Sequence, residues 1–279
     1  MGSAADPGEL YLGLLKECLT NRIYGDVELL PVNSTSGWKR LLVAAIESRG
    51  HRVLRPVPVS DEARLEGREW LPSAHTMIGM RRLDNLQHCI DSVLQDKVPG
   101  DLIEAGVWRG GASIFMRAVL KARGSEDRDV WLADSFQGLP PPNADRYPAD
   151  AGDLHHAVPE LAVTLEEVKA NFARYDLLDE RVRFLPGWFR DTLPQVQIER
   201  LALIRLDGDM YESTINALEA LYPKLSPAGF LIVDDYGGVP GCRQAVDDFR
   251  SANGIVEELR SIDWTGVYWR RGADADADG

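Results

Sequence analysis

Long hydrophobic runs, paired cysteines and an excess of positive charge are all missing from this sequence of 279 residues. No apolar stretch approaches about 20 residues, so no membrane-spanning helix is predicted, and the N-terminus has no apolar signal-peptide core. Cys18, Cys89 and Cys242 lie far apart in the sequence, which indicates reduced thiols. A net charge of −13 argues against binding to nucleic acid or to an anionic membrane. We therefore expect a cytoplasmic protein that binds neither.

Two short apolar runs each end in carboxylates. Residues 201–206 lead into Asp207 and Asp209, and residues 230–233 lead into Asp234 and Asp235. A helical pattern lies between the two runs, so they form one strand–helix–strand unit with both acid clusters at the ligand-binding edge of a sheet. The alternative is that these residues are ordinary acids of surface loops.

The acid clusters contain no Lys or Arg of their own. Several carboxylates that face one pocket cannot all ionise cheaply without a positive charge between them. Since oxygen ligands favour Mg²⁺ over zinc, the pattern predicts a magnesium site.

Three further strand ends carry residues suited to a nucleoside-bearing cofactor. The run 101–107 contains Glu104 and leads into Gly110 and a helix, and glycines at such a turn let the backbone approach a ligand. The run 130–133 ends in Asp134, at the position where ribose hydroxyls are bound in α/β sheets. The run 182–185 is followed by Trp188 and Phe189, which either flank a planar base or pack in the core.

Seven strands that alternate with helices and end in a hairpin predict an α/β fold, a doubly wound sheet with helices on both faces. We expect a helical N-terminal cover over residues 1–80, a cofactor-binding domain over residues 81–271 and a disordered acidic tail over residues 272–279. Residues 139–159 are rich in Pro, Ala and Asp, which predicts a long mobile flap over the ligand edge.

Several ordered blocks make the sequence resemble the macrocin O-methyltransferase (TylF-like) family over residues 11–270. These blocks are His75-Thr76-Met77-Ile78-Gly79, Arg82-Leu83-Asp84-Asn85-Leu86, Glu104-Ala105-Gly106-Val107-Trp108-Arg109-Gly110-Gly111, Asp134-Ser135-Phe136, Asp207-Gly208-Asp209-Met210-Tyr211 and Val233-Asp234-Asp235-Tyr236-Gly237. The resemblance implies a class I methyltransferase, Rossmann-like, seven-stranded sheet. It also implies S-adenosylmethionine and Mg²⁺ as cofactors and a deoxysugar hydroxyl of an antibiotic precursor as acceptor.

Carried over by position, the resemblance implies three metal ligands, Asp207, Asp234 and Asp235. The residues it implies around the cofactor are Thr76, Met77, Glu104, Ala105, Gly106, Val107, Trp108, Arg109, Gly110, Ser113, Asp134, Ser135, Phe136, Gln137, Gly138, Gly187, Trp188, Phe189 and Asp207.

The base that deprotonates the acceptor hydroxyl is expected to be Asp209, with Asp207 as the alternative. Metal-dependent catechol methyltransferases, which the arrangement also resembles, place a Lys three residues after the first metal Asp, but Met210 stands there. The substrate is expected to be a sugar or a glycosylated small molecule, and the chain is expected to form a homo-oligomer through the N-terminal cover. A phenolic or catechol-type O-methyltransferase, a nicotinamide-dependent oxidoreductase and a non-catalytic binding protein remain alternatives.

Overall fold

The computed structural model describes residues 6–25, 27–32, 36–68 and 72–272. Its centre is a seven-stranded sheet in which β9 runs antiparallel to both of its neighbours, while the first five strands of the sheet order pair in parallel. In sheet order the strands are β5 (Val182–Pro186), β4 (Val130–Asp134), β3 (Asp101–Ala105), β6 (Leu201–Leu206), β7 (Leu225–Val233), β9 (Val267–Arg270) and β8 (Arg260–Ser261). The predicted sheet of seven strands with a final hairpin is confirmed.

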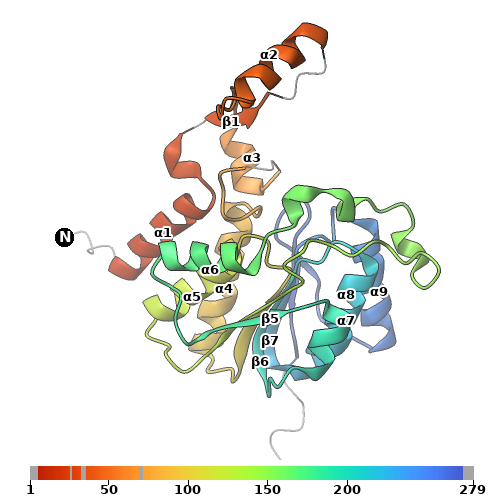
Figure 1. Ribbon diagram of the computed structural model, residues 1–279. Helices are drawn as coiled ribbons and strands as arrows, with labels where there is room; N and C mark the ends of the chain where they lie inside the picture. The colour runs from red at the N-terminus through yellow and green to blue at the C-terminus, as the bar shows by residue number, and fades with distance from the viewer. Residues whose placement is uncertain (1–5, 26, 33–35, 69–71, 273–279) are drawn as a thin grey trace, which may run out of the picture.

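Helices cover both faces of this sheet (Figure 1). One face packs against α1, α4, α5 and α6, and the other packs against α8 and α9. The main-body helices are α4 (Met80–Gln95), α5 (Gly111–Ala122), α6 (Leu165–Arg174), α7 (Phe189–Thr192), α8 (Tyr211–Leu221) and α9 (Pro240–Ala252), and η5 (Leu193–Gln195) and η6 (Tyr222–Lys224) are short 3-10 turns.

Neighbouring residues of a central strand point to opposite faces, which explains the two cores. In β3, Leu102 lies in the core under α4 and α5, whereas Ile103 lies in the core under α8 and α9. Every residue of β6 is buried. The continuous apolar runs of the sequence are therefore the centre of a sheet that is covered on both faces.

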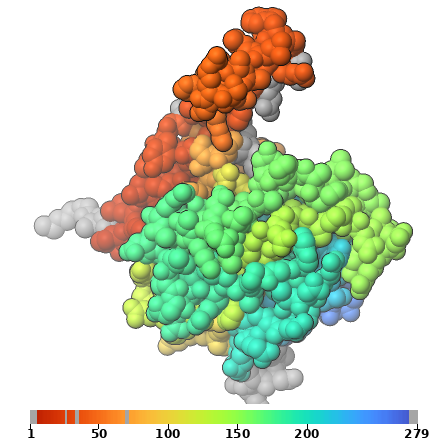
Figure 2. All heavy atoms as spheres, viewed as in Figure 1, coloured from red at the N-terminus to blue at the C-terminus, as the bar shows by residue number. Residues whose placement is uncertain are grey.

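The N-terminal elements divide into a packed part and a projecting part. α1 (Pro7–Leu19) buries Leu12, Leu15 and Leu19 in the same core as α4 and α5. The projecting part is a two-stranded ribbon with α2 between its strands, and it stands clear of the main body (Figure 2). The N-terminal elements after α1 are η1 (Arg22–Tyr24), β1 (Val27–Pro31), α2 (Gly37–Glu47), β2 (Leu54–Pro58) and α3 (Asp61–Glu66).

Only a helical cover was expected in this region, so the antiparallel ribbon of β1 and β2 was missed. The predicted acidic tail lies outside the described residues except for Gly272. Among the helices of the described residues, none is both long and apolar enough to cross a bilayer.

Residues 139–159, predicted as a flap, lie beside the carboxyl ends of the strands. Here and just beyond, the chain forms only short 3-10 turns, η2 (Pro148–Asp150), η3 (His155–Ala157) and η4 (Pro159–Leu161). The buried carboxylate of Asp150 accepts hydrogen bonds from the backbone N–H groups of Tyr211 (2.6 Å) and Glu212 (2.9 Å). Asp150 thus caps α8 and fixes this segment to the turn that carries Asp207 and Asp209.

Candidate active site

A cleft opens at the carboxyl ends of β3, β4 and β6, and the space inside it, open solvent included, is about 730 Å³. The lining residues are Met77, Gly106, Val107, Trp108, Asp134, Ser135, Gly138, Leu139, Pro140, Leu161, Gly187, Trp188, Phe189, Arg190, Asp207, Gly208, Asp209, Glu212, Ser213 and Asn216. Aromatic and apolar walls therefore meet a cluster of carboxylates in one cavity.

Most of the cofactor residues implied by the resemblance lie in this lining, and the rest lie outside it. The lining includes Met77, Gly106, Val107, Trp108, Asp134, Ser135, Gly138, Gly187, Trp188, Phe189 and Asp207. Outside it are Thr76, Glu104, Ala105, Arg109, Gly110, Ser113, Phe136 and Gln137. Several of these support the lining from behind, as Ser113 does by donating a hydrogen bond to Glu104. Their part in cofactor binding stays a prediction.

The turn after β3 is pressed against the end of β6. Gly106 has φ +93°, and a Cβ atom there would lie 1.7 Å from the carbonyl oxygen of Asp207. Only glycine permits this approach. The close contact brings the β3 turn and the acid-bearing turn after β6 to one wall of the cleft.

Asp134 links the ends of β3 and β4. One carboxylate oxygen accepts the N–H of Val107 and the other accepts the N–H of Phe136, each at 2.7 Å. Burial raises the pKa of Asp134, and these backbone donors oppose that shift. Since each carboxylate oxygen has two lone pairs, Asp134 keeps acceptor capacity toward the cleft.

The two acid clusters do meet, as the sequence predicted. Asp207, Asp234 and Asp235 each offer a carboxylate oxygen, and these oxygens all lie within 4.8 Å of one another. Asp209 adopts a left-handed backbone conformation (φ +55°), and its N–H donates to Asp235 at 3.1 Å. Three converging carboxylates are an oxygen donor set of the kind that Mg²⁺ prefers, so these residues fit a divalent cation.

Two arginines from outside the acid clusters lie among these acids, although neither cluster contains a Lys or Arg of its own. Arg205, the fifth residue of the supposedly apolar β6 run, places Nη2 2.7 Å from Oδ1 of Asp234 and 2.9 Å from Oδ2 of Asp207. Its Nη1 pairs with Glu104. Arg82, from the first turn of α4, pairs with the other oxygen of Asp234. Pairing with a carboxylate offsets the free-energy cost of burying an arginine. The strand therefore tolerates an Arg that a simple apolar pattern would not contain.

The two arginines do not balance the acids around them. Six carboxylates belong to the network, on Glu104, Asp207, Asp209, Asp234, Asp235 and Asp263. Burial, followed by the charge of Asp207, raises the pKa of Asp209 to about 7. Burial and neighbouring carboxylates also raise the pKa of Asp207 and, further, that of Asp235. The excess negative charge leaves room for a cation beside the cleft.

A comparison with protein families identifies the family of this chain. Residues 8–271 match the family model described as macrocin-O-methyltransferase (TylF). The chain belongs to the macrocin-O-methyltransferase family.

Curated relatives of this family are similar along most of the chain. An enzyme of Streptomyces olivaceus named 8-demethyl-8-(2,3-dimethoxy-alpha-L-rhamnosyl)-tetracenomycin-C 4'-O-methyltransferase is 52% identical over 96% of this chain and 95% of its own. Mycinamicin III 3''-O-methyltransferase of Micromonospora griseorubida is 49% identical over 95% of this chain and 97% of its own. The chain is thus an O-methyltransferase.

Solved structures agree with the family assignment. The O-methyltransferase NovP superposes with a TM-score of 0.82 at 46% identity, over 95% of this chain and 99% of that chain. The calicheamicin methyltransferase CalS11 superposes with a TM-score of 0.56 at 20% identity, over 97% of this chain and 94% of that chain, which bears on the fold alone. The expected class I methyltransferase fold is confirmed.

Sequence reasoning missed several residues of this O-methyltransferase site. Arg190 and Glu212 line the cleft and pair at 3.0 Å, and Asn216 lies one helical turn after Glu212. Arg82 and Arg205 were missed although each had a signal, because an Arg inside a strand or beside a helical apolar stripe needs a buried carboxylate partner. Leu139 and Pro140 belong to the segment that was predicted as a flap over the ligand edge, whereas Leu161, just beyond that segment, was missed because it lies in an irregular region without a periodic signal.

Proposed function

We propose that this chain transfers a methyl group from S-adenosylmethionine to a hydroxyl of a deoxysugar on a natural product, with Mg²⁺ bound by Asp207, Asp234 and Asp235. The convergence of these three carboxylates beside the glycine turn at Gly106 carries the proposal, because Asp207 belongs both to this carboxylate set and to the lining of the cleft.

The acceptor class rests on the named substrates of the relatives. Their names include a rhamnosyl tetracenomycin, mycinamicin III and a novobiocin precursor, the last for a Streptomyces niveus enzyme that is 55% identical over 76% of this chain and 81% of its own. A deoxysugar attached to an antibiotic scaffold is the common feature that we assign to the acceptor of this chain.

In this proposal the cofactor lies along the ends of β3, β4 and β5. Asp134 would accept from the ribose hydroxyls, and the rings of Trp188 and Phe189 would flank the adenine. Gly106 would let the backbone come close to the methionine part. These contacts would orient the methyl group toward the acids, and orientation provides much of the acceleration in such a transfer.

Held by Asp207, Asp234 and Asp235, a Mg²⁺ ion would supply Lewis-acid chemistry that lowers the pKa of the sugar hydroxyl to be methylated. Asp209 would then accept its proton. Asp209 lines the cleft, and among the described residues none donates a hydrogen bond to its carboxylate. Asp207, as ligand and base together, is the alternative.

The residue three positions after Asp207 supports a carboxylate base, because catechol-type enzymes have a Lys there and this chain does not. Met210 stands there and is fully buried in the structure. Family membership leaves the nicotinamide oxidoreductase and the non-catalytic scaffold without support, whereas a phenolic acceptor is tested by the substrate screen below.

Isothermal titration of S-adenosylmethionine and S-adenosylhomocysteine, with and without Mg²⁺, tests the cofactor and the metal. The wild type is compared with Asp234→Ala/Asp235→Ala. We expect both proteins to bind the cofactor, and only the wild type to release or absorb heat on binding Mg²⁺. Glu126→Ala/Asp127→Ala is the matched control, because this exposed acidic pair lies in the loop before β4. If neither form of the cofactor binds the wild type, the proposal is wrong.

Methyl transfer to glycosylated and phenolic acceptors, followed by mass spectrometry, tests the acceptor class. We expect methylated sugars, and methylation of aglycone phenols alone would favour the catechol-type reading. Asp209→Asn is expected to lower kcat about 10²–10⁴-fold while cofactor and Mg²⁺ affinities hold. Near-normal turnover would remove Asp209 from the role and leave Asp207.

We also propose that the chain forms a homo-oligomer through α2. This helix buries none of its residues, and Trp38, Leu41 and Leu42 are 69%, 69% and 53% exposed. A second copy would cover this apolar face. Light scattering after size exclusion, on the wild type and on Trp38→Ser/Leu41→Ser, tests it, and a monomeric wild type would contradict it.

A further inference from the structure

Arg82 lies where three parts of the chain meet. Its side chain is 6% exposed, although it starts from the third residue of α4. Nη1 pairs with Asp234, and Nε lies 2.9 Å from Oδ2 of Asp263, a fully buried carboxylate in the loop between β8 and β9. The two contacts connect the start of α4 to Asp234, one of the three proposed metal ligands, and to the hairpin of β8 and β9.

The third contact of Arg82 is with the end of the N-terminal cover. Nη2 lies 3.4 Å from the carbonyl oxygens of Glu66 and Gly67, at the end of α3. Gly67 has φ +62°, and a Cβ atom there would lie 2.6 Å from Nη2 of Arg82 and 2.5 Å from the backbone nitrogen of Gly79. The backbone at Gly67 is therefore shaped to fit this guanidinium.

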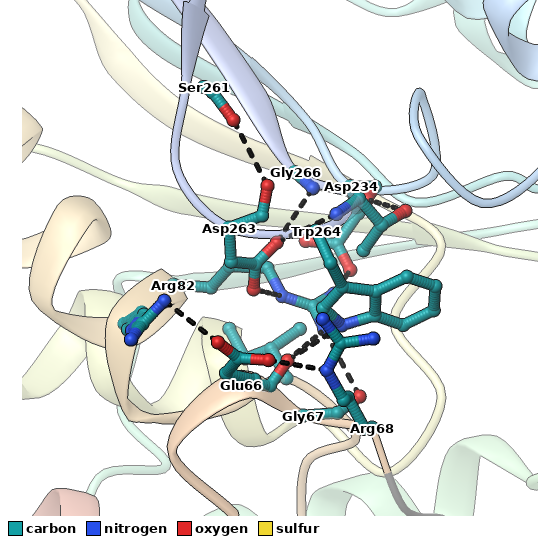
Figure 3. Close-up of polar contacts among 12 residues, drawn as sticks. Glu66, Gly67, Arg68, Arg82, Asp234, Ser261, Asp263, Trp264 and Gly266 are labelled. Carbon is teal, nitrogen blue, oxygen red and sulfur yellow. Dashed lines mark hydrogen bonds and ion pairs between the residues drawn. The ribbon is translucent and has the colours of Figure 1, made fainter. Parts of the chain in front are cut away.

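The loop between β8 and β9 holds the same segment from the other side (Figure 3). The indole N–H of Trp264 donates to the carbonyl oxygen of Glu66 at 2.9 Å, and the guanidinium of Arg68 lies 5.1 Å from the centre of the ring. Asp263 is fixed in turn by the N–H groups of Thr265 (3.0 Å) and Gly266 (2.8 Å). The cover end, the loop and Arg82 form one connected set of contacts.

Each carboxylate oxygen of Asp234 has a guanidinium beside it, Oδ1 with Nη2 of Arg205 at 2.7 Å and Oδ2 with Nη1 of Arg82. The contact at Oδ1 is an ion pair without hydrogen-bond geometry, whereas Arg82 donates a hydrogen bond to Oδ2. The second guanidinium fixes the carboxylate plane, and the position of that guanidinium depends on the carbonyls of Glu66 and Gly67.

We infer that Arg82 is a positioning residue that couples the docking of the α3 end (residues 66–68) to the orientation of Asp234, so that the state of the cover sets the affinity for the metal. The inference rests on the proposed function in that Asp234 is taken as a metal ligand. Coupling between two sites is reciprocal. Mg²⁺ therefore stabilises the docked cover by the same factor by which docking tightens Mg²⁺ binding.

Two variants probe the two ends of this connection in the full-length chain. Arg82→Lys keeps one positive charge but cannot bridge three partners, and Trp264→Phe removes only the N–H that holds Glu66. The controls are Arg117→Lys, whose guanidinium is buried and pairs with Asp179 at 2.7 Å, and Trp131→Phe, whose N–H donates to Asp101 at 2.9 Å. Both controls lose equivalent contacts elsewhere in the fold.

The measurement is titration of Mg²⁺ into each protein with S-adenosylhomocysteine present. Arg82→Lys is expected to weaken Mg²⁺ binding about 10–100-fold, the usual effect of removing a residue that orients a ligand, with S-adenosylhomocysteine affinity unchanged. Trp264→Phe is expected to weaken it less. The double variant is expected to be no worse than Arg82→Lys, since both changes act through one connection. The two controls are expected to match the wild type.

Hydrogen exchange of the peptide covering residues 61–68 gives a readout independent of activity. Mg²⁺ is expected to slow exchange there in the wild type and not in Arg82→Lys. If Arg82→Lys and Trp264→Phe bind Mg²⁺ as the wild type does, or if Arg117→Lys weakens it equally, the coupling is refuted. If the wild type itself shows no Mg²⁺ heat, the metal part of the proposed function fails and the coupling with it.

Discussion

The buried carboxyl of Glu104 gives a prediction in which burial opposes an ion pair. Glu104 is 1% exposed, pairs with Arg205 and accepts from Ser113. Burial raises its pKa from the ordinary 4.5 to about 7, although Arg205 and Ser113 both act to lower it. The charged form is thus less favourable in the folded protein than in the unfolded chain.

The sign and size of the effect follow from linkage. A group whose folded pKa lies above its unfolded value stabilises the fold fully below the unfolded value, and this contribution is lost as the pH rises through the folded value. The change from 4.5 to about 7 corresponds to about 3 kcal/mol, at about 1.4 kcal/mol for each tenfold change in proton affinity. Glu104→Gln carries no charge at any pH and lacks the contribution.

Urea unfolding followed by tryptophan fluorescence, in EDTA at pH 4.5, 6 and 8, tests this prediction. The wild type minus Glu104→Gln difference in the free energy of unfolding is expected to fall by about 3 kcal/mol from pH 4.5 to pH 8. Glu126→Gln controls for the loss of one exposed charge. A difference that stays flat or rises with pH would show that Arg205 keeps Glu104 ionised and that the reasoning from burial is wrong.

Three further variants test the cleft and the core. Gly106→Ala is expected to abolish the heat of S-adenosylhomocysteine binding, because its Cβ would collide with the end of β6, while Gly124→Ala, whose Cβ would meet open space, keeps it. Phe172→Ala removes a fully buried ring and should lower the free energy of unfolding by about 3–5 kcal/mol in urea titrations; a loss below 1 kcal/mol would contradict the packing seen here. Burial lowers the pKa of His75, so its stabilising effect is present above pH 6.5 and is lost as the pH falls. His75→Gln should therefore lose less stability than the wild type on acidification, as thermal melts would show.

The sheet and the meeting of the acids were predictable because each rests on a strong local pattern. The β6 run is buried throughout and closes on Asp207, and β7 closes on Asp234. Parallel neighbours must present their carboxyl ends at one edge, so the acids had to converge. Burial of the run does not reveal which polar residue it tolerates, and Arg205 was therefore read as part of the apolar strand.

The ribbon of β1 and β2 was not predictable from alternation. Glu28 is the only fully buried residue of β1, and β2 contains Pro56 and Pro58, which are depleted in strands. The ribbon is held by polar contacts instead, since the Glu28 carboxylate accepts from Asn21 at 2.6 Å and from Ser73. A strand whose buried side chain is a glutamate lacks the hydrophobic signal on which sequence reasoning depends.

The placement of the two arginines suggests why the acid cluster is built as it is. A buried ion-pair network rarely stabilises a fold more than apolar packing of the same volume does. The role of Arg82 and Arg205 is therefore better explained by the negative charge that they balance. Both pair with Asp234, whereas Asp209 and Asp235, whose pKa values are raised, form no ion pair with an arginine of the described residues. The charge of Asp234 is thus balanced by the two arginines, and the unbalanced negative charge lies on Asp209 and Asp235. In the proposed function, a cation and a hydroxyl proton would arrive on the side of these two acids, so the network would place the affinity for both where the acids face the cleft.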